Sequence, residues 1–300
     1  MPDPRHILIA GPTASGKSAL ALALARDLDG IVVNADALQV YDNWRILSAR
    51  PSLDEEALAP HALYGHVAYN APYSVGAWLR DVAPLLAQDK RLIIVGGTGL
   101  YLSSLTRGLA EIPPTPDVIR AEGDRLRASG PQGFLDYLAT HDPALLARID
   151  RNNPMRLQRA WEVHRATGKP LSAWQEETPS PLLSLDNALG VVLNSAPDVL
   201  AKRIEARFRQ MIDLGALNEV AAMRGRWDPA LPSSKALGAA ELMAHLAGEM
   251  PLETALERSV IATRQFAKRQ RTWFRSNMKD WLQLDIGPLE DMKRTVTSVL

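Results

Sequence analysis

The sequence predicts an α/β fold in which a helical domain is inserted into a core built on a parallel sheet. Short apolar runs that end in a glycine or an aspartate recur through the first hundred residues, as expected for buried parallel strands. Helical patterns follow these runs, which is the alternation typical of a parallel sheet. From residue 113 to about 184, by contrast, helical segments follow one another with no strand between them.

The first apolar run, 6–10, leads through a glycine-rich loop into an Ala/Leu helical segment at 19–25. The loop has the spacing G-x-x-x-x-G-K-S, in which glycines let backbone N–H groups turn toward a phosphate at the start of a helix. We expect Lys17 to neutralise phosphate oxygens and Ser18 to hold Mg²⁺. This predicts a P-loop NTPase-like core. The residues expected to bind a diphosphate or triphosphate are Gly11, Pro12, Thr13, Ala14, Ser15, Gly16, Lys17 and Ser18.

Two further strands are predicted at 30–36 and at 91–95. The first ends in Asp36, and the second runs into a Gly-Gly-Thr-Gly turn that contains Thr98. Because ligands bind at the carboxyl ends of parallel strands, we expect both side chains at the edge that carries the phosphate loop. The spacing alone is also consistent with structural roles, in which Asp36 stabilises a turn and Thr98 caps a helix.

The helical insertion begins at the proline-rich segment 113–116 and closes with the turn-rich segment 178–181. A strand at 188–193 then rejoins the sheet, and the remainder is expected to be mainly helical, with a long segment at 252–275. Helices of the insertion are expected at 121–128, 134–140, 143–149 and 154–167. The predicted parts are a first core part (1–112), the insertion (113–184) and a second core part (185–300) that contains a basic C-terminal helix.

The composition indicates a soluble chain, which we expect to be cytoplasmic. Hydrophobic residues make up 46% of it, yet no apolar run approaches the ~20 residues that cross a bilayer, and no signal peptide pattern precedes the first strand. The absence of cysteine excludes disulfides and thiolate metal sites, and the six histidines have no ligand spacing. The net charge is zero, but residues 258–279 contain seven basic side chains and no acidic one.

The type of reaction depends on a missing carboxylate. An NTP hydrolase of the phosphate-loop class needs a second acid for Mg²⁺ at the end of a neighbouring strand, whereas the run 91–95 ends in Gly-Gly-Thr. This favours a transferase in which Asp36 acts on the acceptor. The alternatives are a small-molecule or nucleotide kinase, for which the basic segment near the C-terminus has no purpose, and a non-catalytic RNA-binding protein, against which the intact phosphate loop argues.

Four strings in this order resemble the bacterial tRNA dimethylallyltransferase family: the phosphate loop, D-A-L-Q-V-Y at 36–41, G-G-T-G-L-Y at 96–101 and T-R-Q-F-A-K-R-Q at 263–270. The resemblance implies transfer of a dimethylallyl group from dimethylallyl diphosphate to the N6 amine of the adenosine 3′-adjacent to the anticodon, with release of diphosphate. It implies Mg²⁺ as cofactor and the tRNA anticodon stem-loop as partner. We expect a monomer with no membrane partner.

The resemblance also implies roles for individual residues. Asp36 is the expected general base, Thr98 orients the amine or Asp36, and Lys17 stabilises the leaving diphosphate. Ala37 departs from the family, which has serine there. Gln39 is expected to hydrogen-bond the edge of the flipped adenine. The residues expected to contact the tRNA are Asp36, Ala37, Leu38, Gln39, Thr98, Arg120, Arg156, Gln158, Arg159, Arg264, Gln265, Lys268, Arg269 and Arg271. For the aromatic residues within 263–275, burial in the core is the favoured interpretation.

Overall fold

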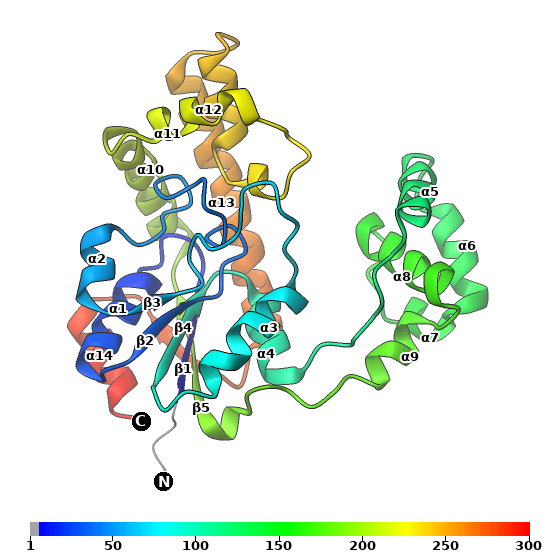
Figure 1. The fold of residues 1–300 in the computed structure, drawn as a ribbon, viewed down its shortest axis with the longest axis horizontal. Coiled ribbons are helices and arrows are strands. Elements are labelled where there is room, and N and C mark those ends of the chain that lie inside the picture. Colours follow the sequence, from blue (N-terminus) through cyan, green and yellow to red (C-terminus); the bar gives the residue numbers. More distant parts are fainter. Residues whose placement is uncertain (1–5) are drawn as a thin grey trace. The chain divides into compact units, whose positions relative to one another are not determined.

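The core is a six-stranded sheet whose strands all pair in parallel, in the order β3-β2-β4-β1-β5-β6 (Figure 1). The computed structural model describes residues 6–300. The strands are β1 His6–Ala10, β2 Ile31–Asn34, β3 His61–Ala62, β4 Leu92–Gly96, β5 Ala188–Asn194 and β6 Leu282–Asp285. The parallel α/β core predicted from the sequence is confirmed.

Four of the six strands coincide with the predicted apolar runs, and two do not. Strand β3 has two residues, which is too short to give a pattern. Strand β6 lies beyond the last predicted helix, 252–275, in a part of the chain expected to be mainly helical, and no strand was predicted there. Its leucines alternate with exposed polar residues, because β6 is an edge strand that pairs only with β5.

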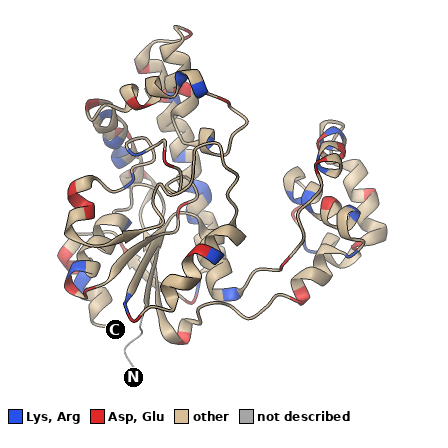
Figure 2. Ribbon diagram, viewed as in Figure 1, with Lys and Arg blue, Asp and Glu red and all other residues tan. Residues whose placement is uncertain are grey.

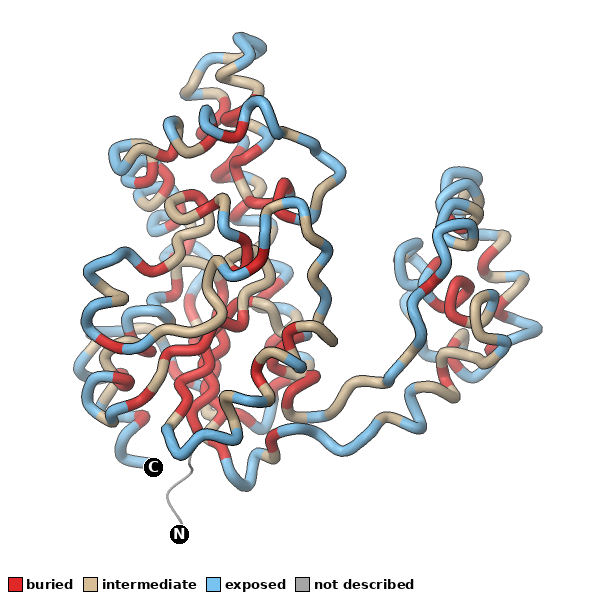
Figure 3. Tube along the Cα trace, in the orientation of Figure 1, coloured by how far each residue is buried: buried red, intermediate tan, exposed pale blue. Residues whose placement is uncertain are grey.

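Helices cover both faces of the sheet, and the strands between them are the most deeply buried part of the chain (Figure 3). Successive residues of β1 point to opposite faces, so Ile7 and Ile9 join one apolar cluster and Leu8 joins the other. The first cluster is covered by α1 (Lys17–Asp27) and α14 (Leu289–Thr297), the second by α3 (Val75–Leu86) and α4 (Gly99–Arg107).

A further layer of helices lies beyond the carboxyl ends of the strands (Figure 1). It consists of α10 (Pro197–Asp213), α11 (Ala216–Ala222), α12 (Ala239–Leu246) and the first part of α13 (Leu252–Asn277). Their core includes Trp44, Phe208 and Val260. With 26 residues, α13 is about 39 Å long, and its Phe274 belongs to the cluster under the sheet. This helix therefore spans both layers.

The chain divides into two compact units, and the second is Arg107–Pro181. Its apolar core includes Phe134, Leu157 and Trp161. It contains α5 (Asp117–Ala128), α6 (Gln132–His141), α7 (Pro143–Leu146), α8 (Pro154–Thr167) and α9 (Leu171–Glu176). The division falls at 106/107 and 181/182, while the sequence placed it at 113 and 184. That this unit contacts tRNA stays a prediction.

Helix α8 shows why its limits could be predicted to the residue. The Asn153 side chain accepts a hydrogen bond from the backbone N–H of Arg156, and Pro154 occupies the first turn, where no intrahelical donor is lost. Gly168 ends the helix in the left-handed conformation, with φ of 70°. The remaining short elements are α2 (Leu53–Leu58) and 3₁₀ helices at Leu185–Asn187, Arg224–Arg226 and Ser233–Lys235.

No helix within residues 6–300 combines the length and the apolar character needed to cross a membrane.

Truncation of the central strand tests this description of the core. Ile93 is fully buried in β4, between β1 and β2, so Ile93→Ala removes packing that the sheet cannot recover. We expect a loss of about 2–5 kcal/mol in the free energy of unfolding, measured by urea denaturation. Leu53→Ala, at a side chain that is 72% exposed, is the control and should stay within about 0.5 kcal/mol of the original chain. Equal losses in both variants would contradict the assignment of the core.

Candidate active site

The phosphate loop joins β1 to α1 as the sequence predicts. Gly16 adopts a left-handed conformation, with φ of 89°, immediately before Lys17 opens the helix. No side chain caps the start of α1, so its first backbone N–H groups remain available to an anion. The Ser15 N–H donates to the Pro12 carbonyl at 3.2 Å, which closes the loop into a tight turn. The loop therefore has the backbone geometry of an anion site.

Two cations lie over this loop. The Lys17 Nζ donates to the Pro12 carbonyl at 3.3 Å, and Arg207 reaches the same cavity from α10. Burial lowers the pKa of Lys17 to about 8; repulsion by Arg207 also lowers it, while Asp36 opposes the shift. Burial also lowers the pKa of Arg207, against the attraction of Asp36 and Glu55. Two partly desolvated cations near one carboxylate favour the binding of a further anion.

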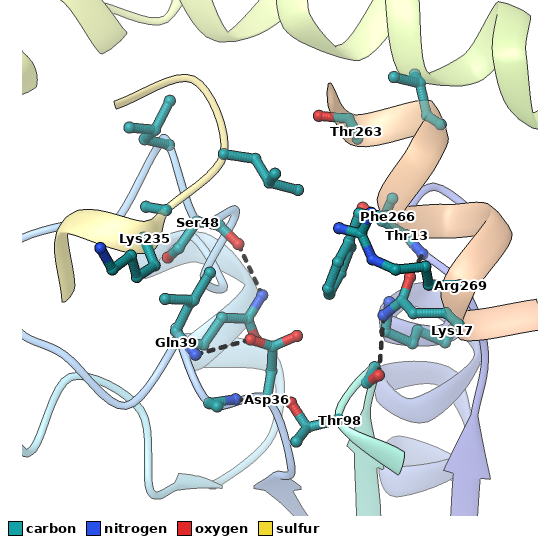
Figure 4. A pocket seen from close by; sticks show the side chains of 18 of the residues that line it. Thr13, Lys17, Asp36, Gln39, Ser48, Thr98, Lys235, Thr263, Phe266 and Arg269 are labelled. Atoms are coloured by element: carbon teal, nitrogen blue, oxygen red, sulfur yellow. Dashed lines mark hydrogen bonds between the residues drawn. The ribbon is translucent and has the colours of Figure 1, made fainter. Parts of the chain in front are cut away.

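Asp36 is held by its neighbours at the end of β2. The buried Asn34 accepts from the Asp36 N–H at 2.9 Å and donates to the Asp36 carbonyl at 3.0 Å. The Asp36 Oδ1 accepts from the Leu38 N–H at 2.9 Å, and the carboxylate lines the cavity (Figure 4). One oxygen is thus used to fix the turn, and Oδ2 is left to act on a ligand.

Thr98 ties the end of β4 to the Asp36 loop. Its Oγ1 accepts from the Ala37 N–H at 2.9 Å, across the sheet edge. Gln39 also holds backbone, because its amide Nε2 donates to the carbonyls of Ser48 and Ala49 at 2.9 and 3.0 Å. Both amide hydrogens of Gln39 are committed, so its carbonyl oxygen is the group left for the adenine contact predicted from the sequence.

Helix α13 closes over the Gly-Gly-Thr-Gly turn, and the glycines are what permit it. A Cβ on Gly97 would lie 2.3 Å from Nε2 of Gln270, and a Cβ on Gly99 would lie 2.2 Å from the Trp273 ring. On Gly96 it would lie 2.0 Å from the Ala35 carbonyl oxygen. Real Cβ atoms do not approach other atoms so closely, so any side chain here would push the helix or the neighbouring strand away.

These elements enclose a cavity of about 510 Å³ (Figure 4). Its polar end is formed by the loop and the strand ends, including Lys17, Ser18 and Asp36. The rest of its wall is largely apolar and comes from the helical layer and the loop after β2; it includes Leu47, Ile204, Phe208, Met211, Ala236 and Leu237. Arg207 and Lys235 also line it, and no local pattern marks them, because they come from segments remote from the motifs. Gln270, the last residue of the T-R-Q-F-A-K-R-Q string, lines it as well, but the sequence assigned it no role.

Comparison with known proteins shows which family has this sequence and fold. The IPP transferase family model matches residues 39–277, and the isopentenyl transferase model matches residues 4–60. The chain belongs to the IPP transferase family. A tRNA dimethylallyltransferase of Cereibacter sphaeroides is 57% identical over 284 residues, which cover 95% of this chain and 90% of that protein. One of Ruegeria sp. is 56% identical over 282 residues, covering 94% and 96%.

Solved structures of the same family share the fold. A tRNA isopentenylpyrophosphate transferase of Staphylococcus epidermidis superposes with a TM-score of 0.69 at 29% identity, covering 99% of both chains. A eukaryotic dimethylallyltransferase, studied while acting on tRNA, gives a TM-score of 0.82 at 27% identity and covers 99% of this chain and 78% of its own. The core architecture of an IPP transferase is therefore present in full.

Figure 2 marks the lysine and arginine positions along the chain. The basic side chains of α13 that are predicted to contact tRNA have different surroundings. Arg264 pairs with Glu205 at 3.4 Å, and the Arg269 guanidinium lies 5.7 Å from the centre of the Phe266 ring, at the main cavity. Lys268 and Arg271 line a separate cavity of about 540 Å³ beside the start of α10. Gln265 is exposed. Their contacts with RNA stay predictions.

All three aromatic residues of α13 line the cavity, but they differ in burial. Phe274 is buried in the cluster under the sheet, as the sequence interpretation favoured. Phe266 and Trp273 are only partly buried and line the cavity. They reach the cavity because α13 crosses the end of the sheet that carries the phosphate loop.

In the second unit, Arg120, Arg156 and Arg159 are exposed. Arg159 donates to the hydroxyl of Thr115 at 2.9 Å. Gln158 is instead buried, and its Nε2 donates to Asp124 and Glu162 at 3.0 and 2.8 Å. Of this side chain only the carbonyl oxygen has no partner. The three arginines thus keep guanidinium groups on the surface, and the role of all four in RNA binding stays a prediction.

The position of the Lys17 titration predicts how donor affinity depends on pH. Below about pH 8 Lys17 is charged and the affinity for dimethylallyl diphosphate should be constant. Above about pH 8 Lys17 is mostly neutral in the free protein and must take up a proton when the anion binds. The affinity should therefore fall by up to about tenfold per pH unit. Calorimetric titration with Mg²⁺ between pH 7 and 9 measures this. The control, Lys17→Met, should bind weakly with a flat profile, and a flat profile in the original chain would refute the assignment.

Proposed function

We infer that this IPP transferase moves a dimethylallyl group from dimethylallyl diphosphate to the N6 amine of the adenosine 3′-adjacent to the anticodon in tRNA. The observation that carries this inference is a single cavity with an anion-binding loop at one end, a carboxylate beside it and an apolar wall beyond. Such a cavity suits a donor with a diphosphate head and a small hydrocarbon tail. The names of the two bacterial relatives and of the eukaryotic structure agree with this reaction.

The loop end of the cavity would hold the diphosphate. Cleavage of the allylic C–O bond leaves negative charge on the departing diphosphate and positive charge on carbon. The N–H groups at the start of α1, together with Lys17 and Arg207, which line the cavity, would stabilise this negative charge. Because the wall beyond the loop is largely apolar, water that would capture the allylic cation is kept from the reacting carbon.

Ser18 would hold Mg²⁺ together with the diphosphate. Its exposed hydroxyl lies in the first turn of α1 and lines the cavity. Within residues 6–300 no group of three or more histidine, aspartate or glutamate side chains is placed to hold a metal alone. One hydroxyl fits Mg²⁺, which takes few protein ligands and completes its shell with phosphate oxygens and water. When bound, the ion neutralises charge on the leaving diphosphate.

Asp36 would act at the acceptor. The amine lone pair of adenine is delocalised into the ring, so the nitrogen is a weak nucleophile that must lose a proton as the new C–N bond forms. Asp36 Oδ2 is the group placed to accept that proton, since Oδ1 is held by the Leu38 N–H. Thr98 acts indirectly, by fixing the Ala37 backbone next to the base.

The adenosine must leave the anticodon loop to reach Asp36. Basic side chains of α13 and the arginines of the second unit would hold the phosphates of the flanking nucleotides. We propose that the enzyme acts as a monomer. Since the substrate is tRNA, we assign the reaction to the cytoplasm.

A kinase is not favoured. Strand β4 ends in Gly96 and is followed by Gly97 and Thr98, so no acid stands where a phosphate-loop kinase or hydrolase holds its second Mg²⁺ ligand. The strand end is instead filled by α13.

Asp36→Asn tests the chemistry directly. We expect affinity for dimethylallyl diphosphate to stay within about twofold, because the loop is untouched, and the single-turnover rate of adenosine prenylation to fall by about 10²- to 10⁴-fold. Nucleoside mass analysis of an unmodified tRNA measures the transfer. Asp42→Asn, at an exposed aspartate after the same strand, is the matched control and should transfer normally. A near-normal rate for Asp36→Asn would remove Asp36 as the base.

The acceptor has its own test. With dimethylallyl diphosphate as donor, tRNA should be prenylated and adenosine monophosphate should not, because the basic side chains of α13 and the arginines of the second unit have no role with a mononucleotide. Efficient transfer to the mononucleotide would overturn tRNA as the substrate.

A further inference from the structure

Gln270 is a buried side chain that joins the two loops at the polar end of the cavity. Its Oε1 accepts from the Thr13 N–H at 2.9 Å, and its Nε2 donates to the Gly97 carbonyl at 2.9 Å. The residue is 6% exposed and belongs to α13. Thr13 lies in the loop assigned to the diphosphate, and Gly97 immediately precedes Thr98. One amide thus touches both halves of the site.

Only a side-chain amide of this length satisfies both loops at once. Thr13 presents a donor and Gly97 presents an acceptor, and an amide offers one group of each kind at a fixed separation. A carboxylate has no donor for Gly97, and an apolar side chain leaves both backbone groups unpaired in a buried place. Gln270 packs directly against Gly97, because a Cβ on Gly97 would lie 2.3 Å from the Gln270 Nε2 and 3.4 Å from the Asp36 Oδ2.

We propose that Gln270 is a positioning residue that sets the separation between the leaving diphosphate and the acceptor turn. The proposal rests on the transferase function inferred above. Transfer requires the allylic carbon and the amine nitrogen to meet at about 3–3.5 Å, and a displacement of about 1 Å costs on the order of 10²-fold in rate. The carbon is placed by the loop that contains Thr13, and the amine by the turn that contains Thr98. Gln270 fixes one of these relative to the other.

The first test compares two glutamines with similar bonding. In Gln283, outside the cavity, Nε2 donates to the carbonyls of Met278 and Trp281. We expect Gln270→Met to lower kcat by about 10- to 100-fold with both substrates saturating. Gln283→Met, at an exposed side chain of β6, is the control outside the cavity and should keep the original kcat. An unchanged kcat in Gln270→Met, or an equal fall in both variants, would overturn the proposal.

The second test uses a side chain that regains the missing donor on protonation. In Gln270→Glu the ionised carboxylate repels the Gly97 carbonyl oxygen, whereas the protonated form has one donor and one acceptor, like the amide. Burial and the nearby Asp36 raise the pKa of the introduced carboxyl, and Lys17, Arg207 and Arg269, which line the same cavity, lower it. NMR titration of the variant measures this pKa, and the rate of the variant relative to the original chain should rise as the pH falls through it. A ratio that stays constant across the measured pKa would refute the positioning role.

These outcomes are separable from failure of the proposed function. If the original chain does not prenylate tRNA, the function inferred for the site is wrong, and the Gln270 proposal falls with it. If the original chain transfers and Gln270→Met matches it, the function stands and only the positioning role is lost.

Discussion

The parallel pairing of β2, β4 and β1 is the constraint on which the site depends. Their register aligns Ala10 with Gly96 and Asn34 with Val95, so the three strands end together. The phosphate loop, Asp36 and Thr98 follow those ends directly, and no tertiary adjustment is needed to gather them. What remains is to cover the edge, and α13 does so by packing on glycines that leave no room for side chains. Sheet and helix together fix the spacing between the anion loop and the carboxylate.

The charges of the cavity fit a donor that brings negative charge with it. The chain as a whole has zero net charge, but charge is unevenly distributed at the cavity. Lys17 and Arg207 lie there in one partly desolvated site, with Asp36 as the nearby acid. Burial costs these cations solvation, which is why the pKa of Lys17 is lowered to about 8. A bound diphosphate relieves this cost and is held more strongly than it would be at an exposed surface. The apolar wall beyond the loop suits the hydrocarbon part of the proposed donor.

Most elements of the fold could be predicted from local sequence patterns. The features that could not be predicted depend on packing between segments that are far apart in the sequence. Four strands, the phosphate loop and α8 follow from apolar runs, glycine spacing and caps, because these signals lie within about fifteen residues of the chain. Strand β6 pairs at an edge with a strand far away in sequence, so it left only a weak alternation. Arg207 reaches the cavity from α10, and nothing in its own segment shows what it faces. Gln270 ends the T-R-Q-F-A-K-R-Q string, but that string does not show which two loops its amide joins. Gln158, expected at an RNA surface, is buried because its amide completes the packing of α5 and α8.

The most direct test of the account is the choice of donor. Purified protein with Mg²⁺ and an unmodified tRNA is supplied with either dimethylallyl diphosphate or ATP, and the digested nucleosides are analysed by mass. We predict a prenylated adenosine at the position after the anticodon with dimethylallyl diphosphate, and no change with ATP. An unmodified tRNA in both reactions, together with consumption of ATP when a small acceptor is present, would contradict the assignment of the cavity.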